Sequence, residues 1–141
     1  MKGGSPAGKS TTFTWAASAH AVPAAPGSNA ASFDGNAING APLSTRPSTF
    51  HQATRPGVLR NLFVRNDLVM GAGIGVNYTV YINEVATGIT CNIAGAAQLN
   101  ASDITNSAPV AQGDRIHIHM DRSAGVPPAI VSAMELELAS A

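Results

Sequence analysis

Charged residues are scarce in this sequence: Asp, Glu, Lys and Arg make up 11% of its 141 residues, against about 25% in typical soluble domains. Eight basic residues balance eight acidic ones, so the chain has no excess of Lys and Arg with which to hold nucleic-acid phosphates. We therefore expect no nucleic-acid partner. A nearly neutral surface of small polar residues suits a protein that is packed into an assembly.

Cysteine and long apolar runs are also nearly absent. Cys91 is the only cysteine, which excludes an intrachain disulfide and a thiolate metal cluster, and its place in an apolar pattern predicts a buried small side chain. No run of about 18 apolar residues predicts a membrane span, and no apolar signal segment begins the sequence. We expect no membrane partner and synthesis in the cytoplasm.

Signatures of catalysis are missing as well. The sequence has no G-x-S-x-G, H-E-x-x-H or calcium-loop motif, so we expect neither an enzyme nor a cofactor. Gly3–Ser10 matches the phosphate-binding pattern G-x-x-x-x-G-K-[ST]. A phosphate-binding loop must follow a buried strand and open a helix, and neither is predicted at this position. The glycines of Gly71–Gly75 resemble a dinucleotide loop, yet no helix is predicted after them. Glu135 and Glu137 share a strand face, where such a pair is usually just solvated.

What the sequence does have is alternation of apolar and polar residues, the period of a β-strand. It predicts a hairpin of Val76–Ile82 and Ile89–Ile93 with a turn at Asn83–Ala86. Further strands are predicted at Thr11–Trp15, Val58–Arg65, Arg115–Met120 and Ile130–Leu138, with breaks at Gly71–Gly75, Gly95–Asn106 and Gln112–Asp114. Because no segment has a sustained helical period, these short strands predict an all-β fold, a jelly-roll β-sandwich of antiparallel strands.

The N-terminal part differs in composition from the rest. Ala16–Gly57 is rich in Ala, Pro, Gly, Ser and Asn and predicts a long irregular N-terminal arm. We divide the chain into an N-terminal strand plus arm over residues 1–57 and a jelly-roll body over residues 58–141, within one structural domain. Because structureless connections of this length are unusual, we expect short irregular strands in the arm and contact with a neighbouring subunit.

His117 and His119 are the candidate metal residues, since they share one face of a predicted strand. Zinc sites require three or four ligands, and the other histidines, His20 and His51, lie in the arm. We therefore expect no metal and place the pair on a polar outer or interface face. A ring of these histidines around a symmetry axis is a further alternative, which would bind an ion or repel on protonation near pH 6.

Four segments resemble a known family: Gly57–Arg65, Val76–Thr87, Ala111–Ile116 and the acidic and apolar last strand. They are similar to the small tumour-necrosis-factor-like or complement-like jelly rolls of phage structural proteins and bacterial surface-filament tips. The resemblance covers over half of the chain. It implies compact trimers whose apolar strand faces meet around a three-fold axis, with a role in adhesion or capsid decoration and no catalysis.

This resemblance leads us to expect a homotrimeric decoration or cement protein on the outer surface of a bacteriophage head, in contact with the major capsid protein or other virion proteins. No stalk precedes the domain, which favours decoration over a filament tip. The alternative is a receptor- or glycan-binding head of a phage fibre or spike, although aromatics are only 5%. A small β-sandwich enzyme would need a third metal ligand beside His117 and His119. The predicted assembly residues are Phe13, Trp15, Phe33, Phe50, Tyr78 and Tyr81.

Overall fold

The computed structural model describes residues 13–21, 27–31, 51–123 and 130–140. Within these ranges all regular elements are β-strands, and none of them contains a helix that could cross a membrane. The strands are β1 (Phe13–Ala21), β2 (Gly27–Ala31), β3 (His51–Gln52), β4 (Gly57–Asn66), β5 (Gly71–Ile82), β6 (Val85–Gly95), β7 (Asn100–Val110), β8 (Arg115–Arg122) and β9 (Val131–Ala139).

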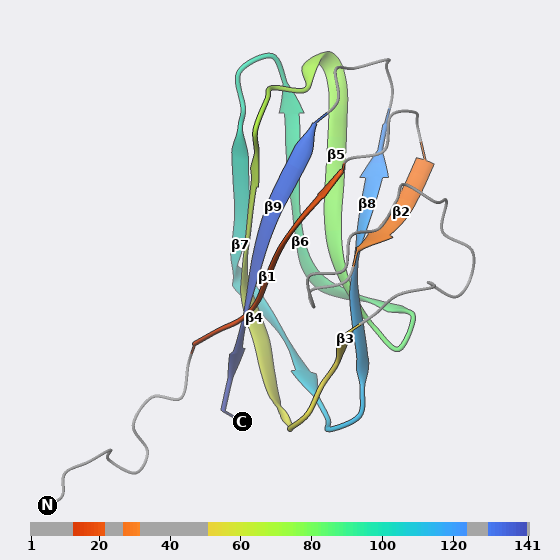
Figure 1. Cartoon of the computed structure of the whole chain (residues 1–141), viewed down its shortest axis with the longest axis vertical. Coiled ribbons are helices and arrows are strands. Elements are labelled where there is room, and N and C mark those ends of the chain that lie inside the picture. The colour runs from red at the N-terminus through yellow and green to blue at the C-terminus, as the bar shows by residue number, and fades with distance from the viewer. Residues whose placement is uncertain (1–12, 22–26, 32–50, 124–129, 141) are drawn as a thin grey trace, which may run out of the picture.

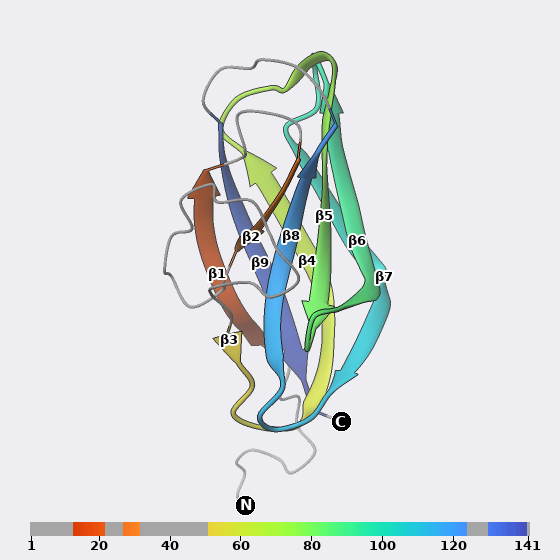
Figure 2. The same ribbon diagram turned by 90° about the vertical axis from the view of Figure 1, so that its right-hand side faces the viewer.

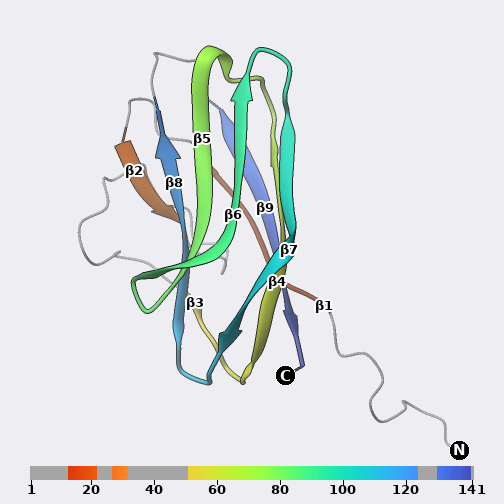
Figure 3. The same ribbon diagram turned by 180° about the vertical axis from the view of Figure 1, so that it is seen from behind.

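The strands form two antiparallel sheets that pack face to face as a sandwich (Figure 1). The four-stranded sheet has the order β1-β9-β4-β7, and the five-stranded sheet has the order β2-β8-β5-β6 with β3 also paired to β8. Figure 2 shows the five-stranded sheet in front of the four-stranded one. Along one side of the sandwich β6 and β7 lie next to each other although they belong to different sheets (Figure 3).

The connections between the sheets follow a jelly-roll order. β2 pairs with one part of β8, from Ile118 to Arg122, and β3 pairs with Arg115 and Ile116, so the two short strands share one position in the sheet. Each sheet then has four strand positions, and the chain passes from one sheet to the other after β1, β3, β4, β6, β7 and β8. This arrangement of eight positions is that of a jelly roll, which confirms the predicted fold class.

The core lies between the sheets and follows the alternation seen in the sequence. Leu62 and Val64 of β4 face inward and are buried, as predicted. The inward positions of β8 and β9 are also buried, namely Ile116, Ile118, Met120, Met134, Leu136 and Leu138. Burial of one such side chain stabilises the fold by about 1.5–3 kcal/mol. A slip of one residue would expose a whole row of them, so the core fixes the register of both strands.

The β5–β6 hairpin turns at Asn83 and Glu84, which have positive φ angles of 51° and 65°. Two successive residues with positive φ match a two-residue hairpin turn, whose twist suits the flanking strands, and Asn tolerates this conformation well. The predicted turn was longer, since β6 already begins at Val85. Asn83 also ties the turn to β8, because its backbone N–H donates to the Arg115 carbonyl at 2.8 Å.

The N-terminal strands extend further than the sequence pattern predicts. β1 does not end at Trp15 but continues to Ala21, and it pairs with β9 over its length. β2 and β3 also fall within the segment predicted to be irregular, whereas residues 32–50 lie outside the described residues. The Ala and Ser positions of β1 and β2 have low strand propensity, so pairing with β9 and β8 supplies what the local sequence does not.

Two predicted breaks are wrong. Gly71–Gly75 opens β5, where pairing with β6 shifts between Gly71 and Gly75; Gly71 and Gly73 have positive φ, so the glycines form an irregular strand start rather than a loop. The predicted loop Gly95–Asn106 contains most of β7. Apart from Ile104, the outward positions of this edge strand are polar or small, so its sequence has no clear apolar alternation, and its pairing with β4 defines it.

Candidate functional site

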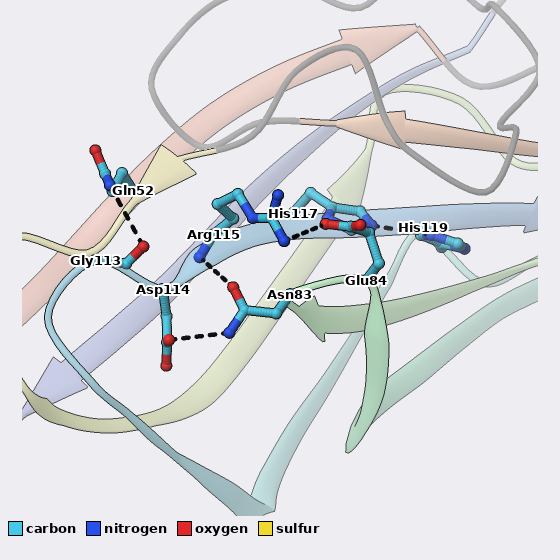
Figure 4. Close-up of polar contacts among 8 residues, drawn as sticks. All are labelled: Gln52, Asn83, Glu84, Gly113, Asp114, Arg115, His117 and His119. Carbon is cyan, nitrogen blue, oxygen red and sulfur yellow. Dashed lines mark hydrogen bonds and ion pairs between the residues drawn. The ribbon is translucent and has the colours of Figure 1, made fainter.

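A cluster of one tyrosine and two histidines lies on the side of β8 that faces away from the core. Tyr81 of β5 is the register partner of His117. Its ring stacks on His119 with 3.5 Å between ring centroids and 7° between planes, and on His117 with a centroid distance of 5.2 Å. The two Nε2 atoms of the histidines are 3.0 Å apart (Figure 4). One imidazole therefore donates a hydrogen bond to the other.

Both imidazoles are neutral at pH 7. Burial, the neighbouring His119 and the Arg115 charge lower the pKa of His117 to about 4. Burial also lowers the pKa of His119, although the Asp121 carboxylate opposes that shift. A second proton on the pair would remove the only acceptor between the rings and place two positive charges side by side.

The histidine pair lies on the outer face of the sheet, but His117 is covered there and only 1% exposed, because its ring packs against Tyr81 and His119. The other histidines are not brought into one cluster by the described backbone: His20 lies on β1 in the opposite sheet, and His51 lies on β3 opposite Ile116. Among the residues that the structure describes, no group of three His, Cys, Asp or Glu side chains is placed to hold a metal ion.

Next to this cluster, polar contacts join the β5–β6 turn to the start of β8 (Figure 4). The Arg115 guanidinium contacts the Glu84 carboxylate at 2.8 Å. Asn83 accepts the Arg115 backbone N–H at 3.0 Å and donates to the Asp114 carboxylate at 2.9 Å. Asp114 also accepts the Ala111 backbone N–H at 2.8 Å, and these two hydrogen bonds lower its pKa. The charged groups here are engaged in holding the turns together.

The outer face of the four-stranded sheet has a different character. Phe63 lies between Ser102 of β7 and Glu135 of β9 in register, and its side chain is 47% exposed. It borders a groove of about 480 Å³ whose lining residues come from β4, β7 and β9: Phe63, Val64, Arg65, Asn100, Ala101, Ser102, Ala133 and Glu135. A large exposed aromatic surrounded by small side chains is typical of a contact surface.

Two charges of opposite sign flank Phe63 on this face. Arg65 lies two residues beyond Phe63 on β4, and Glu135 is the β9 partner of Phe63. In the described part of the chain neither side chain forms an ion pair or a side-chain hydrogen bond. Glu137, in contrast, contacts Arg60 at 3.4 Å and accepts a hydrogen bond from Asn61 at 2.8 Å. The two glutamates that share the β9 face therefore have different surroundings.

The predicted assembly residues end up in different places. Tyr78 is fully buried, and its hydroxyl bonds Asn66 and Ser132 of the opposite sheet at 3.1 and 2.7 Å; burial raises its pKa to about 12. Tyr78 is thus a core residue and not a surface contact. Tyr81 is half-buried in the histidine cluster. Phe13 and Trp15 lie on β1, where only the backbone is described, and Phe33 and Phe50 lie outside the described residues.

Phe63 was missed by the sequence analysis although a signal for it exists. In the predicted strand Val58–Arg65, Leu62 and Val64 take the inward positions, so Phe63 between them must point outward. A large aromatic on the outward row is the sign of a contact surface. Cys91, expected to be a buried small side chain, is half-buried, and burial with the nearby Asp103 charge raises its pKa to about 12, so its thiol is unreactive.

Comparison with known proteins adds no relative: no protein family matches the chain, and no curated protein matches its sequence. The features from which a function is inferred are therefore the jelly-roll fold, the face around Phe63 and the cluster around Tyr81.

Proposed function

We propose that this chain is a structural protein of a bacteriophage particle, a homotrimer that decorates and cements the outer surface of the head. The observation that carries the proposal is the outer face of the four-stranded sheet, where the Phe63 side chain is 47% exposed beside a groove of about 480 Å³. Jelly rolls with such faces are common building blocks of viral shells. The role is that of a binding and packing module without catalysis.

The face around Phe63 suits contact with a second copy of the chain. Ser102 and Ala133, which line the groove beside Phe63, are small, so a partner surface can approach the ring closely. Arg65 and Glu135 add one positive and one negative charge to the same face, and each lacks an ion-pair partner among the described residues. A surface of the next copy that offers one acidic and one basic group can pair these charges while burying the ring, which combines an apolar centre with a polar rim.

A ring of three copies can form if the Phe63 face of one copy contacts a different surface of the next copy. Such heterologous contacts form rings when their rotation closes, and a ring of three leaves one end of each sandwich free for the shell. The partners of the trimer are then the major capsid protein or other virion proteins, reached through the region of residues 1–57. Charged residues make up only 11% of the chain, and this low content favours a protein packed into an assembly over a free monomer.

The test measures oligomeric state by sedimentation velocity over a dilution series. The Phe63→Glu variant places a charge at the centre of the proposed contact, and we expect it to sediment as a folded monomer where the natural chain sediments as a trimer. Val85→Glu is the matched control, because Val85 is 67% exposed at the start of β6 in the other sheet and is not among the residues that line the groove. A natural chain that stays monomeric at micromolar concentration and on the particle contradicts the proposal.

A second candidate function is favoured by the same groove. An aromatic ring with a guanidinium, a carboxylate and an amide close by, as in Phe63, Arg65, Glu135 and Asn100, is a set of groups that can hold a sugar ring and its hydroxyls. This would make the chain a receptor- or glycan-binding head of a fibre or spike. Locating the chain in purified particles separates the two: head binding supports decoration, and presence only at fibre tips supports the glycan head.

A further inference from the structure

The two histidines on β8 hold their Nε2 atoms within hydrogen-bond distance of each other. His117 and His119 are two residues apart on one strand, so their side chains project from the same side of the sheet. Their Nε2 atoms are 3.0 Å apart (Figure 4). Each Nε2 atom carries either a lone pair or one proton, so two nitrogen atoms that can act as metal ligands face the space between the rings.

We propose that His117 and His119 together bind one Cu²⁺ ion through their two Nε2 atoms. With imidazole nitrogens about 2.0–2.1 Å from a metal, a separation of 3.0 Å corresponds to a nitrogen–metal–nitrogen angle of about 91–97°. That is the angle between neighbouring ligands in the square-planar or tetragonal sites that Cu²⁺ and Ni²⁺ prefer. Tetrahedral Zn²⁺ asks for a wider angle of about 109°.

The rings are already held in place for this geometry. Tyr81 stacks flat on His119, with 3.5 Å between centroids, and Thr79 and Tyr81 of β5 pair in register with His119 and His117. His117 is buried and His119 is half-buried, so neither ring has to give up much conformational freedom when it binds an ion. Binding then requires the Nε2 proton of the donor ring to move to its Nδ1, so that both neutral imidazoles offer an Nε2 lone pair, and no rearrangement of the strand.

The ligand set also favours Cu²⁺ over the other divalent ions. No third His, Cys, Asp or Glu side chain joins the pair among the described residues, and water is the ligand that we assign to the remaining positions. With so few protein ligands the intrinsic order of affinities decides, and Cu²⁺ stands at its top. The nearby Arg115 cation is paired with Glu84 at 2.8 Å, which reduces its repulsion of a bound ion.

The experiment titrates the full chain, freed of metal with a chelator, with Cu²⁺ alone and follows binding by calorimetry and electron paramagnetic resonance. We expect one Cu²⁺ per chain with a tetragonal spectrum and splitting from two nitrogens, and weaker binding of Ni²⁺ and Zn²⁺. His119→Ala should weaken Cu²⁺ binding by at least tenfold. His20→Ala is the matched control, because His20 lies on β1 in the other sheet, and it should bind as the natural chain does.

Two further measurements locate the ion and remain valid if His119→Ala fails to fold. In the natural chain, Cu²⁺ should broaden the NMR signals of Tyr81 and His119 at substoichiometric amounts. Tyr81→Phe keeps the stacked ring and should keep the affinity, whereas Tyr81→Ala frees His119 and should reduce it. The proposal is overturned if Cu²⁺ binding is absent, if it survives unchanged in His119→Ala, if Zn²⁺ binds more tightly, or if the broadened signals lie elsewhere. The proposal is independent of the trimer.

Discussion

Asp103 is a buried carboxylate that joins the two sheets where β6 and β7 meet. Its side chain is 6% exposed and accepts the backbone N–H of Thr90 on β6 at 3.0 Å, together with backbone and side-chain groups of Thr105 and Asn106 on β7. Burial by itself raises the pKa of Asp103, but these hydrogen bonds prevail and hold it well below the usual range. The charge is therefore satisfied and fastens the two sheets together at this side.

Asp114 does similar work at a surface turn, which leads to the first stability prediction. Asp114→Ala removes the acceptor of the Ala111 backbone N–H and of the Asn83 amide, and we expect a loss of about 1 kcal/mol. Glu135→Ala is the matched control, since Glu135 is exposed and forms no bond with a described residue, and its effect should stay within about 0.5 kcal/mol. Urea denaturation measures both. Equal losses would mean that the turn does not depend on its carboxylate.

At the scale of elements, β8 carries both the apolar core row and the histidine pair, and its histidines make stability depend on pH. The pKa of His117 is lowered to about 4 in the folded protein, below the value of about 6.5 in an unfolded chain. As pH falls below 6.5, the unfolded state takes up a proton that the folded state refuses. The contribution of His117 to stability is therefore fully present above about pH 7 and is lost as pH falls from about 6.5 to 4.

We expect the metal-free protein to lose about 2 kcal/mol of unfolding free energy between pH 7 and pH 5 because of His117. Arg115 opposes protonation of His117, while Asp121 favours protonation of His119. Urea denaturation in chelator measures the loss, and a His117→Gln variant should show a smaller pH dependence over the same interval. The same slope in that variant would assign the effect to other groups.

The elements that the sequence predicts well are those with a full apolar row. From Ile116 to Met120 on β8 and from Met134 to Leu138 on β9 every second residue is large and apolar, so burial of that row follows from the strand period alone. β7 has no such row: it reaches from Asn100 to Val110 with small polar residues, and only its pairing with β4 makes it a strand. β1 beyond Trp15 is the same case. Pairing between distant segments is not encoded in local alternation.

The candidate sites follow the same rule. That His117 and His119 share a strand face follows from their spacing, but the Tyr81 ring stacked on them comes from β5, and strand order decides that neighbour. Tyr78 lies on the opposite face of β5 from Tyr81 and points inward, where its hydroxyl forms hydrogen bonds with Asn66 and Ser132 of the other sheet. An aromatic with a polar end suits both a core and a contact surface, so the sequence by itself could not separate the two.

At the scale of the whole molecule, the closed sandwich leaves few ways to grip another surface. The sheets bury most of their large apolar residues against each other. The large apolar residues that stay exposed in the described part of the chain are Phe63, Leu68, Val69, Val85, Ile104 and Val131. If the Phe63 face is used for the trimer, attachment to a shell must come from another part of the chain. The region before β4 is the part left for this role.

The last prediction follows from this division of labour. Residues 1–10 precede β1, which begins at Phe13, so their deletion leaves all strands of the sandwich in place. We expect the shortened chain to form soluble trimers but to lose binding to preassembled phage shells, because each trimer would lose three attachment points at once and with them its avidity. Shells decorated with the natural chain should release their DNA at a higher temperature than bare shells, followed with a DNA-binding dye, and shells mixed with the shortened chain should behave as bare ones. If the shortened chain still binds and protects shells, attachment lies in the sandwich itself; if neither chain binds shells but both adsorb to cells, the chain is a receptor-binding head.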